Sequence, residues 1–368
     1  MQKNKFTITV FPVTALALLS ALCMLFSGCY TLKQGSALLG YLNRAVPLEE
    51  LLDPPAKSKI KSNDANRSFA QRVYDIRSFA MEELGLKMSK NYTRYVQIEQ
   101  DYLAAVVSAC APDSFNRHLW HFPIVGAVPY KGFFDDKDAL KEREKLKKKG
   151  LDVWIRGVEA FSTLGWFKDP LYSYMQEYPI ERLAELLIHE LLHATVFVKG
   201  HVQFNEELAE FVGSEGAKLY IESRFGRDSA EYQKILLREL DELAFVSFIH
   251  ELIDELETLY ASDAEREEKL IEKERIIKSA KERFAGEYYS RFSNNNYLGF
   301  TELPVNNAYF DLYRLYYEKD SFFADLYAET LGEGIPKLHA FIDKAASLNN
   351  SREGRKNPRK ALNTMYTT

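Results

Sequence analysis

The pattern of apolar and polar positions along the chain is mainly helical. Apolar residues recur at three- and four-residue spacing, which places them on one face of a helix. This spacing predicts helices in four stretches: 66–111, 180–198, 229–288 and 306–347. A further stretch, 136–149, is highly charged and predicts a surface helix that ends at Gly150, because glycine readily adopts the left-handed conformation of a helix C-cap.

The clearest helical signal lies in 180–198, and Gly200 is expected to break this helix. Its shared apolar face is formed by Ile180, Leu183, Leu187, Leu191 and Ala194. A second helix is expected to begin at Asn205, because asparagine is a favoured N-cap and the two glutamates that follow suit a helix N-terminus.

Only two stretches predict β-structure. In 151–161, Val153 and Ile155 alternate with polar or aromatic neighbours, which is the period of a strand. Residues 118–135 are rich in aromatic residues, Pro and Gly, and predict a loop with a short strand. The expected fold class is therefore predominantly α with a small β-sheet, an α+β protein.

The second half of the chain carries a long charged segment and a basic end. Acidic and basic residues are interspersed through 229–288, which favours a solvated helical hairpin over a coiled coil that binds a partner. We interpret 29–350 as one domain in which about 229–290 is a helical insertion. The basic and polar residues 351–368 are expected to form a disordered tail.

Composition and charge fit a globular protein without a nucleic-acid partner. The 368 residues are 46% hydrophobic and 27% charged, with a formal net charge of −5. These proportions are ordinary for a globular protein, and no basic excess suggests nucleic-acid binding. Of the three cysteines, Cys110 alone lies beyond residue 29. A disulfide or a cysteine zinc site within the mature chain is therefore not expected.

The first 28 residues have the plan of a secretory signal. Lys3 and Lys5 precede an uncharged apolar run, and the small residues Ser27 and Gly28 lead to Cys29. This order predicts a bacterial lipoprotein, cleaved before Cys29 and lipidated there. The alternative is an uncleaved membrane anchor, since about 20 apolar residues can span a bilayer. Both alternatives place the rest of the chain outside the cytoplasm, as a membrane-anchored protein of the cell envelope that faces the periplasm or exterior.

The candidate chemistry lies in His189-Glu190-Leu191-Leu192-His193, an HExxH sequence on the strongest predicted helix. Residues four apart share a helix face, so both imidazoles can bind one Zn²⁺ at about 2.0–2.1 Å. Glu190 lies one step round the helix, where it can reach a metal-activated water without ligating the metal. The pattern predicts a zinc metallopeptidase with Glu190 as general base.

The segment Asn205-Glu206-Glu207-Leu208-Ala209-Glu210 resembles the Asn-Glu-x-x-x-Asp/Glu segment of the glutamate-zincins, the thermolysin-like and aminopeptidase-N-like enzymes. The resemblance implies that Glu206 is the third zinc ligand and that Glu210 orients a zinc-bound histidine. Only twelve residues separate His193 from Glu206, fewer than in those families, so a tight turn at 199–201 is required. The alternative is that these glutamates merely favour a helix N-terminus.

Other histidines are weaker candidates for the third ligand. The metzincin pattern is excluded, because Val196 and Lys199 occupy the positions of its glycine and histidine. His201 lies in the expected turn. His250 begins an HExxD sequence that we interpret as ordinary helix. Two histidines of the aromatic stretch are expected to be structural: His118 and His121.

The resemblance extends to a bacterial family of aminopeptidases, predicted lipoproteins with a glutamate-zincin-like HExxH segment. It rests on PIVGAVPYKGFF (123–134), GLDVWIRGVEAFSTLGWFKDP (150–170), LLIHELLHAT (186–195), FNEELAEFVGSEGA (204–217) and NNAYFDLYRLYY (306–317). It covers most of residues 29–345 and implies a zincin-like enzyme that hydrolyses peptides, as an aminopeptidase with one Zn²⁺.

The resemblance to zincins also suggests substrate-contacting residues. Glutamate-zincins commonly supply a tyrosine or histidine as donor to the oxyanion, for which the candidates are Tyr316 and Tyr317, then Tyr309. The strand before the metal helix is expected to pair with an extended peptide. Glu159 on that strand is a candidate for binding a free α-ammonium, and Tyr130 for lining the cleft.

Two other functions remain open at this stage. One is a non-catalytic envelope lipoprotein, in which a structural zinc site accompanies a partner-binding role. A structural site has no need of a base, so the presence of Glu190 argues against it. The other is a different hydrolase on the same site, an endopeptidase or an enzyme acting on peptidoglycan peptides.

Overall fold

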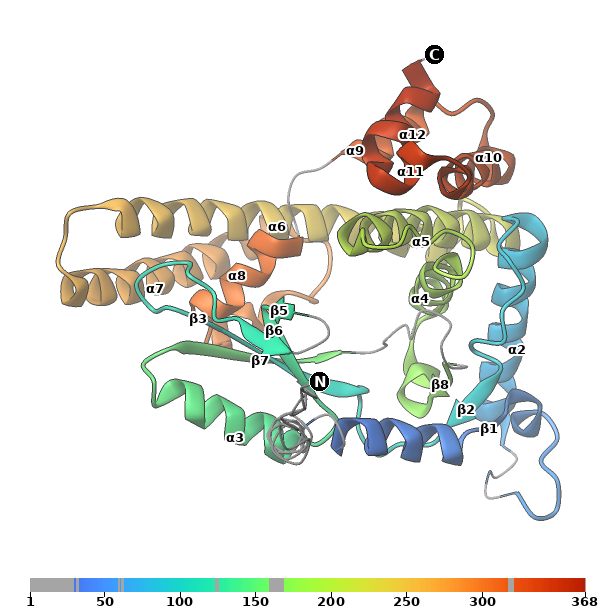
Figure 1. Ribbon diagram of the computed structural model, residues 1–368, viewed down its shortest axis with the longest axis horizontal. Coiled ribbons are helices and arrows are strands. Elements are labelled where there is room, and N and C mark those ends of the chain that lie inside the picture. The colour runs from blue at the N-terminus through green and yellow to red at the C-terminus, as the bar shows by residue number, and fades with distance from the viewer. Residues whose placement is uncertain are drawn as a thin grey trace, which may run out of the picture.

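The structure is a computed structural model that describes residues 30, 33–58, 60, 63–122, 126–158, 169–316 and 321–367. In this part of the chain the fold is mostly helical with small sheets, so the α+β prediction is confirmed (Figure 1). None of the helices in these ranges is both long and apolar enough to cross a membrane. The predicted signal lies outside the described residues.

The largest hydrophobic core includes the buried faces of α4 and α5, the two helices that carry the HExxH and Asn-Glu segments. The helices packed around it are α2 (Asp64–Ser78), α4 (Ile180–Leu192), α5 (Val202–Phe225) and α10 (Gly334–Ser347). A small sheet of order β1-β2-β8 lies beside α2: β1 (Val46–Pro47), β2 (Arg94–Val96) and β8 (Leu171–Tyr172). Short helical turns complete it: η1 (Leu48–Leu51), the π-turn η2 (Phe79–Glu83), η3 (Ser173–Glu177) and η5 (Leu348–Asn350).

A second sheet has β3 at its centre, paired antiparallel with β6 and β7. Its strands are β6 (Tyr130–Phe133), β3 (Ala104–Cys110) and β7 (Asp152–Val158), with α3 (Asp136–Lys147) packed against them. A hairpin of β4 (Trp120–Phe122) and β5 (Gly126–Val128) adjoins. The predicted strand in 151–161 and the charged helix in 136–149 are both confirmed. Gly150 has a φ of 76°, as a left-handed helix end requires.

The prediction of helices through 66–111 is right for α2 and wrong for β2 and β3. Every residue of Ala104–Cys110 is buried, because β3 is the central strand and both α3 and the helix at residues 307–316 pack against it. A short strand that is apolar at every position except Ser108 shows no alternation, so its sequence cannot be distinguished from a buried helix by periodicity. The helical spacing of Tyr95, Ile98, Tyr102 and Val106 is therefore a coincidence.

The charged segment forms two long helices, α6 (Ala230–Ala261) and α7 (Arg266–Arg291), joined as the predicted hairpin. Its inner face is not solvated. With the 3-10 turn η4 (Leu298–Glu302) and α8 (Asn307–Tyr316) it encloses a separate aromatic core: Phe245, Phe248, Phe284, Phe300 and Phe310. A buried Lys273 of α7 donates to Asp152 of β7 at 2.8 Å, which joins the hairpin to the second sheet.

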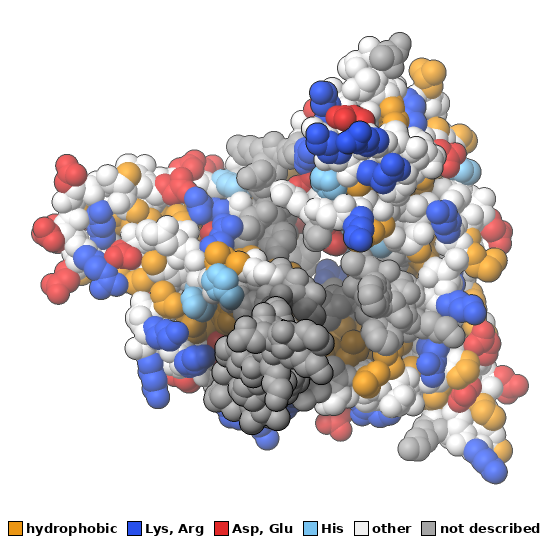
Figure 2. All heavy atoms as spheres, viewed as in Figure 1, with side chains coloured by type: hydrophobic (Ala, Val, Ile, Leu, Met, Phe, Trp, Pro, Cys, Tyr) orange, Lys and Arg blue, Asp and Glu red, His pale blue; other side chains and the backbone are white. Residues whose placement is uncertain are grey.

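The C-terminal residues are helical, so the prediction of a disordered tail is wrong. Along the chain, one helix precedes α10 and two follow it: α9 (Phe322–Ala328), α11 (Arg352–Lys356) and α12 (Pro358–Thr367). Lys and Arg side chains gather over this end of the molecule (Figure 2). The sequence looks disordered because few residues are apolar, but Leu362 is fully buried in the main core and Arg359 pairs with Glu207 of α5.

Candidate metal centre

The two histidines of HExxH lie one helical turn apart at the end of α4. His189 is in the last turn, and His193 is the C-cap with φ −56° and ψ −26°, so the helical spacing is kept through both. The helix ends six residues before the predicted 198. The amides of Thr195 and Val196 both donate to the carbonyl of Leu192, at 2.7 and 2.8 Å, and this turn closes the helix.

The turn between the helices is held by Asn205, which is not the N-cap that the sequence predicted. Helix α5 already begins at Val202, and Gly200 turns the chain with a φ of 85°. The Asn205 side chain is 1% exposed. It accepts from Val198 N at 2.8 Å and donates to Val198 O at 3.0 Å. Asn205 therefore clamps the end of the preceding segment and fixes where Glu206 lies.

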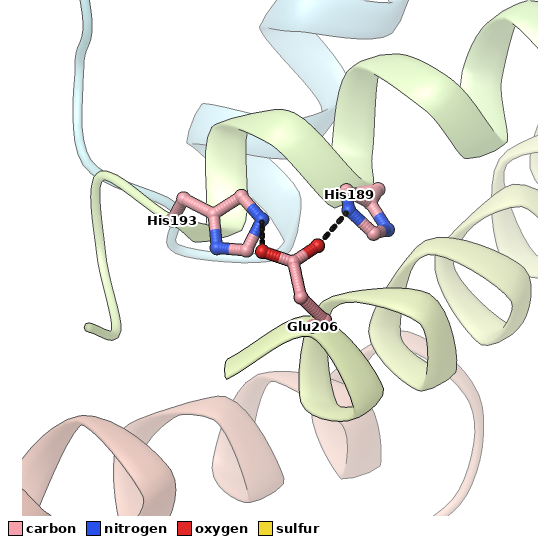
Figure 3. A group of neighbouring side chains, drawn as sticks. All are labelled: His189, His193 and Glu206. Atoms are coloured by element: carbon pink, nitrogen blue, oxygen red, sulfur yellow. Dashed lines mark ion pairs between the residues drawn. The ribbon is translucent and has the colours of Figure 1, made fainter. Parts of the chain in front are cut away.

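Glu206 lies between the two imidazoles (Figure 3). Its Oε2 is 3.5 Å from His189 Nε2, and its Oε1 is 3.6 Å from His193 Nε2. One ligand atom from each of the three residues lies within 4.8 Å of the others. Ligand atoms of a tetrahedral zinc ion, bound at about 2.0–2.1 Å, are about 3.3–3.4 Å apart. The donor set and its spacing therefore fit one divalent cation.

The protonation preferences of the cluster also suit a cation. Burial alone raises the pKa of Glu206, but the imidazoles of His189 and His193 outweigh it and lower this pKa to about 2. Glu206 is therefore a carboxylate at neutral pH. Both ring nitrogens of His193 are buried without a hydrogen-bond partner among the described residues. Buried polar atoms without partners are uncommon, and ligation of a metal is a recognised explanation.

Glu190 points into the protein beside the two ligands. It is 7% exposed, and its Oε2 has no hydrogen-bond partner among the described residues. Burial raises the pKa of Glu190, and this rise is opposed by His189, His193 and the hydroxyl of Tyr92. A carboxylate whose pKa is raised towards neutrality is suited to accept and release a proton.

Glu210 follows Glu206 by one turn of α5. Its charge contributes to raising the pKa of His189, although burial of the imidazole acts in the opposite direction. No hydrogen bond joins these two described side chains, so the predicted role in orienting a histidine stays a prediction. Burial and the charge of Glu242 raise the pKa of Glu210, so Glu242 is a second acidic group near Glu210.

Of the remaining predicted residues, those that the structure describes are not part of the three-residue cluster. Tyr130 is exposed at the first position of β6, and its substrate role stays a prediction. Tyr309 belongs to the aromatic core, with its hydroxyl 3.2 Å from that of Tyr313. His201 Nε2 lies 3.2 Å from the carbonyl of Arg355, so it serves the C-terminal helices. Outside the described parts are Cys29, Glu159, Tyr317 and the side chain of Tyr316.

Tyr92 is a neighbour of the centre that the sequence did not indicate. It lies between the π-turn and β2, far from HExxH along the chain. It is buried, and burial and then the charge of Glu190 raise its pKa, which makes the two groups neighbours. A single tyrosine among 22 carries no signal of its own in the sequence. Only the fold places it.

Comparison with known proteins agrees with the geometry. A family model described as "Putative aminopeptidase" matches residues 29–360, which include α4, α5 and all three candidate ligands. The chain belongs to this family. At this coarse level it is a peptidase. None of the curated proteins and none of the solved structures compared with it matches.

Proposed function

We propose that this member of the aminopeptidase family is a zinc-dependent peptide hydrolase. The observation that carries the proposal is the convergence of His189, His193 and Glu206 at distances suited to one cation, next to a buried Glu190. Three protein ligands of this type are the set of a catalytic zinc site, which keeps a position open for water or substrate. A structural site would fill all four positions.

Glu190 is the general base and then the general acid. When bound, zinc would supply Lewis-acid polarisation of the peptide carbonyl and would make water a better nucleophile at neutral pH. Glu190 accepts the proton that the attacking water releases. It then delivers this proton to the departing amine nitrogen as the peptide bond breaks, so the carboxylate is regenerated. Its position one residue after His189 holds it at the centre through both transfers.

Hydrolysis from a free N-terminus is the activity we favour. The family description supports an exopeptidase. Glu210 lies near His189 and Glu242 lies near Glu210, and an acidic environment attracts the α-ammonium of an unblocked peptide. Strand β7 is an outer strand of the described second sheet, where an extended peptide can add by main-chain hydrogen bonds.

The test uses residues 30–368 loaded with zinc and a library of unblocked and N-acetylated peptides. Glu190→Gln should retain zinc and lose hydrolysis by at least about 100-fold. Glu181→Gln is the matched control, because Glu181 is also buried on α4 but lies in its first turn. Normal turnover by Glu190→Gln would refute the mechanism. Equal cleavage of acetylated peptides would show an endopeptidase, and no cleavage by the native protein would favour a non-catalytic role.

We also propose that the protein is held at the membrane of the cell envelope by a lipid on Cys29. The support is the basic, apolar and small-residue order of residues 1–29. Replacement of Cys29 by Ala should abolish incorporation of labelled fatty acid and leave the unprocessed precursor. Unchanged labelling would rule out this attachment site.

A further inference from the structure

A buried tyrosine hydroxyl faces the base of the proposed reaction. Tyr92 is 1% exposed, and neither its hydroxyl nor Glu190 Oε2 has a hydrogen-bond partner among the described residues. The two groups are neighbours. Burial raises the pKa of Tyr92 and the charge of Glu190 raises it further, while the Tyr92 hydroxyl opposes the rise in the pKa of Glu190. A buried donor and a buried acceptor are thus neighbours, and neither Tyr92 OH nor Glu190 Oε2 has another partner among the described residues.

The backbone of Tyr92 is held in a conformation that tyrosine rarely adopts. Its φ of 59° makes it the one non-glycine residue with a left-handed backbone in the described part of the chain. For a bulky side chain this conformation is strained. Such strain persists only where the surrounding structure imposes it, and it clusters at functional sites.

Hydrogen bonds to Tyr92 and to the residues just before it hold this conformation. Tyr92 N donates to Asp169 O at 2.7 Å. Before it in the chain, the buried guanidinium of Arg77 donates to Asn91 O and, at 2.8 Å, to Ser89 O. The buried guanidinium of Arg77 thus donates hydrogen bonds to two backbone carbonyls of this segment. Burial lowers the pKa of Arg77, as expected for a guanidinium that is removed from water.

The same segment is tied to the end of the metal helix. The amide of Lys87 donates to Thr195 Oγ1 at 2.9 Å, two residues beyond His193. At Gly85, with a φ of 71°, a Cβ would lie 2.4 Å from His339 Nε2, so the segment also passes tightly against α10. Residues 85–92 therefore form a loop that follows the π-turn and is hydrogen-bonded to the segment just after α4. This loop carries Tyr92, the neighbour of Glu190.

We propose that Tyr92 is a positioning residue for Glu190. Its hydroxyl donates a hydrogen bond to Oε2 and leaves Oε1 to accept the proton of the attacking water. Catalytic hydrogen bonds are often long in free enzymes and tighten when substrate binds, which accounts for two facing groups outside hydrogen-bond geometry. This inference rests on the proposed function, since it concerns the same proton transfer.

The kinetic test is Tyr92→Phe in the zinc-loaded protein, because it removes only the hydroxyl. We expect kcat on unblocked peptides to fall about 10- to 100-fold, with KM and zinc content within twofold of the native values. Tyr95→Phe is the matched control. Tyr95 is equally buried, but its hydroxyl bonds to Gln97 at 2.8 Å and accepts from Gln176 at 3.2 Å. An unchanged kcat, or an equal fall in both variants, would overturn the proposal.

A second test needs no activity. In zinc-free protein, the shift in urea midpoint caused by Tyr92→Phe should differ between the native background and a Glu190→Ala background, because the hydroxyl and the carboxylate interact only when both are present. Additive shifts would show that the two groups do not interact. Failure of Tyr92→Phe to fold, while Tyr95→Phe folds, would also count against a positioning role.

The proposed hydrolysis and the role of Tyr92 can be refuted separately. If Glu190→Gln hydrolyses peptides like the native protein, the proposed function is wrong and Tyr92 has no base to position. If Glu190→Gln is inactive and Tyr92→Phe is fully active, only the role of Tyr92 is wrong.

Discussion

Gly213 of α5 lies directly against His189 of α4. A Cβ at Gly213 would approach the Cβ of His189 to 3.1 Å and the carbonyl oxygen of Glu185 to 3.0 Å. Glu206 lies two turns earlier on the same face of α5. Because this glycine lets the two helices approach closely, the Glu206 carboxylate can reach both imidazoles.

Gly213→Ala is expected to destabilise the protein and weaken zinc binding. Alanine gains about 0.5–1 kcal/mol over glycine within a helix. Overpacking against a backbone carbonyl that cannot rotate away costs about 1–3 kcal/mol, so the loss should win. Gly286→Ala is the control, since nothing lies within 4 Å of the added Cβ on α7. Urea unfolding should show a lower midpoint for the first and a higher one for the second. A stabilised Gly213→Ala would mean that the helices separate freely.

Asn205→Ala should lower the free energy of unfolding by about 1–3 kcal/mol, because it leaves the buried amide and carbonyl of Val198 without their partner. Zinc affinity should also fall, since the turn that places Glu206 is loosened. Gln203→Ala provides the comparison. It removes an exposed amide of the same helix, whose bond is to Glu207 at 2.9 Å. Similar losses in the two variants would show that the clamp has no special role.

Removal of zinc by a chelator should lower the melting temperature. A ligand that binds only the folded state, at 1,000 times its Kd, stabilises by about 4 kcal/mol. His193→Ala should abolish this difference, and the variant should lose zinc in elemental analysis. His121→Ala should keep both, because His121 is exposed on β4, away from the cluster. Full zinc retention by His193→Ala would remove this residue from the ligand set.

Cys110 should be inert to alkylation in the native protein. Burial, together with the charges of Asp311 and Asp152, raises its pKa from 9.0 to about 12. Since the thiolate is the reactive form, at pH 9 only about one thiol in a thousand is reactive, against half for an ordinary thiol. In residues 30–368, which contain no other cysteine, iodoacetamide labelling should stay slow up to pH 9 and become fast in urea. Rapid native labelling would show that the β3 region opens.

The two histidines of the candidate metal centre could be predicted because their geometry is local. A helix sets the relation between residues four apart whatever packs around it, so HExxH on an amphipathic helix was enough for His189, Glu190 and His193. The strand β7 was equally accessible, because one of its faces is more polar than the other. The sequence of β3 carries no such signal, since burial on both faces erases the alternation that marks a strand.

Glu206 marks the limit of what sequence could supply. Glu206 was predicted as a ligand only from a resemblance to the glutamate-zincins. Twelve residues separate it from His193, so the sequence does not fix the distance between the two side chains. The turn at Gly200, the clamp of Asn205 on Val198 and the close approach at Gly213 together decide that distance. The C-terminal helices show the same limit, because their order depends on the burial of Leu362 and the pairing of Arg359, and neither is visible in a basic sequence.

By itself the sequence determined which functional groups are present: two imidazoles and a carboxylate on one helix, and further carboxylates on the next helix. The tertiary structure alone decided that Glu206 lies between the imidazoles and that Tyr92 faces Glu190. The physical reason is range. Backbone hydrogen bonds fix neighbours within a turn of helix, whereas contacts between distant segments depend on how the whole core packs.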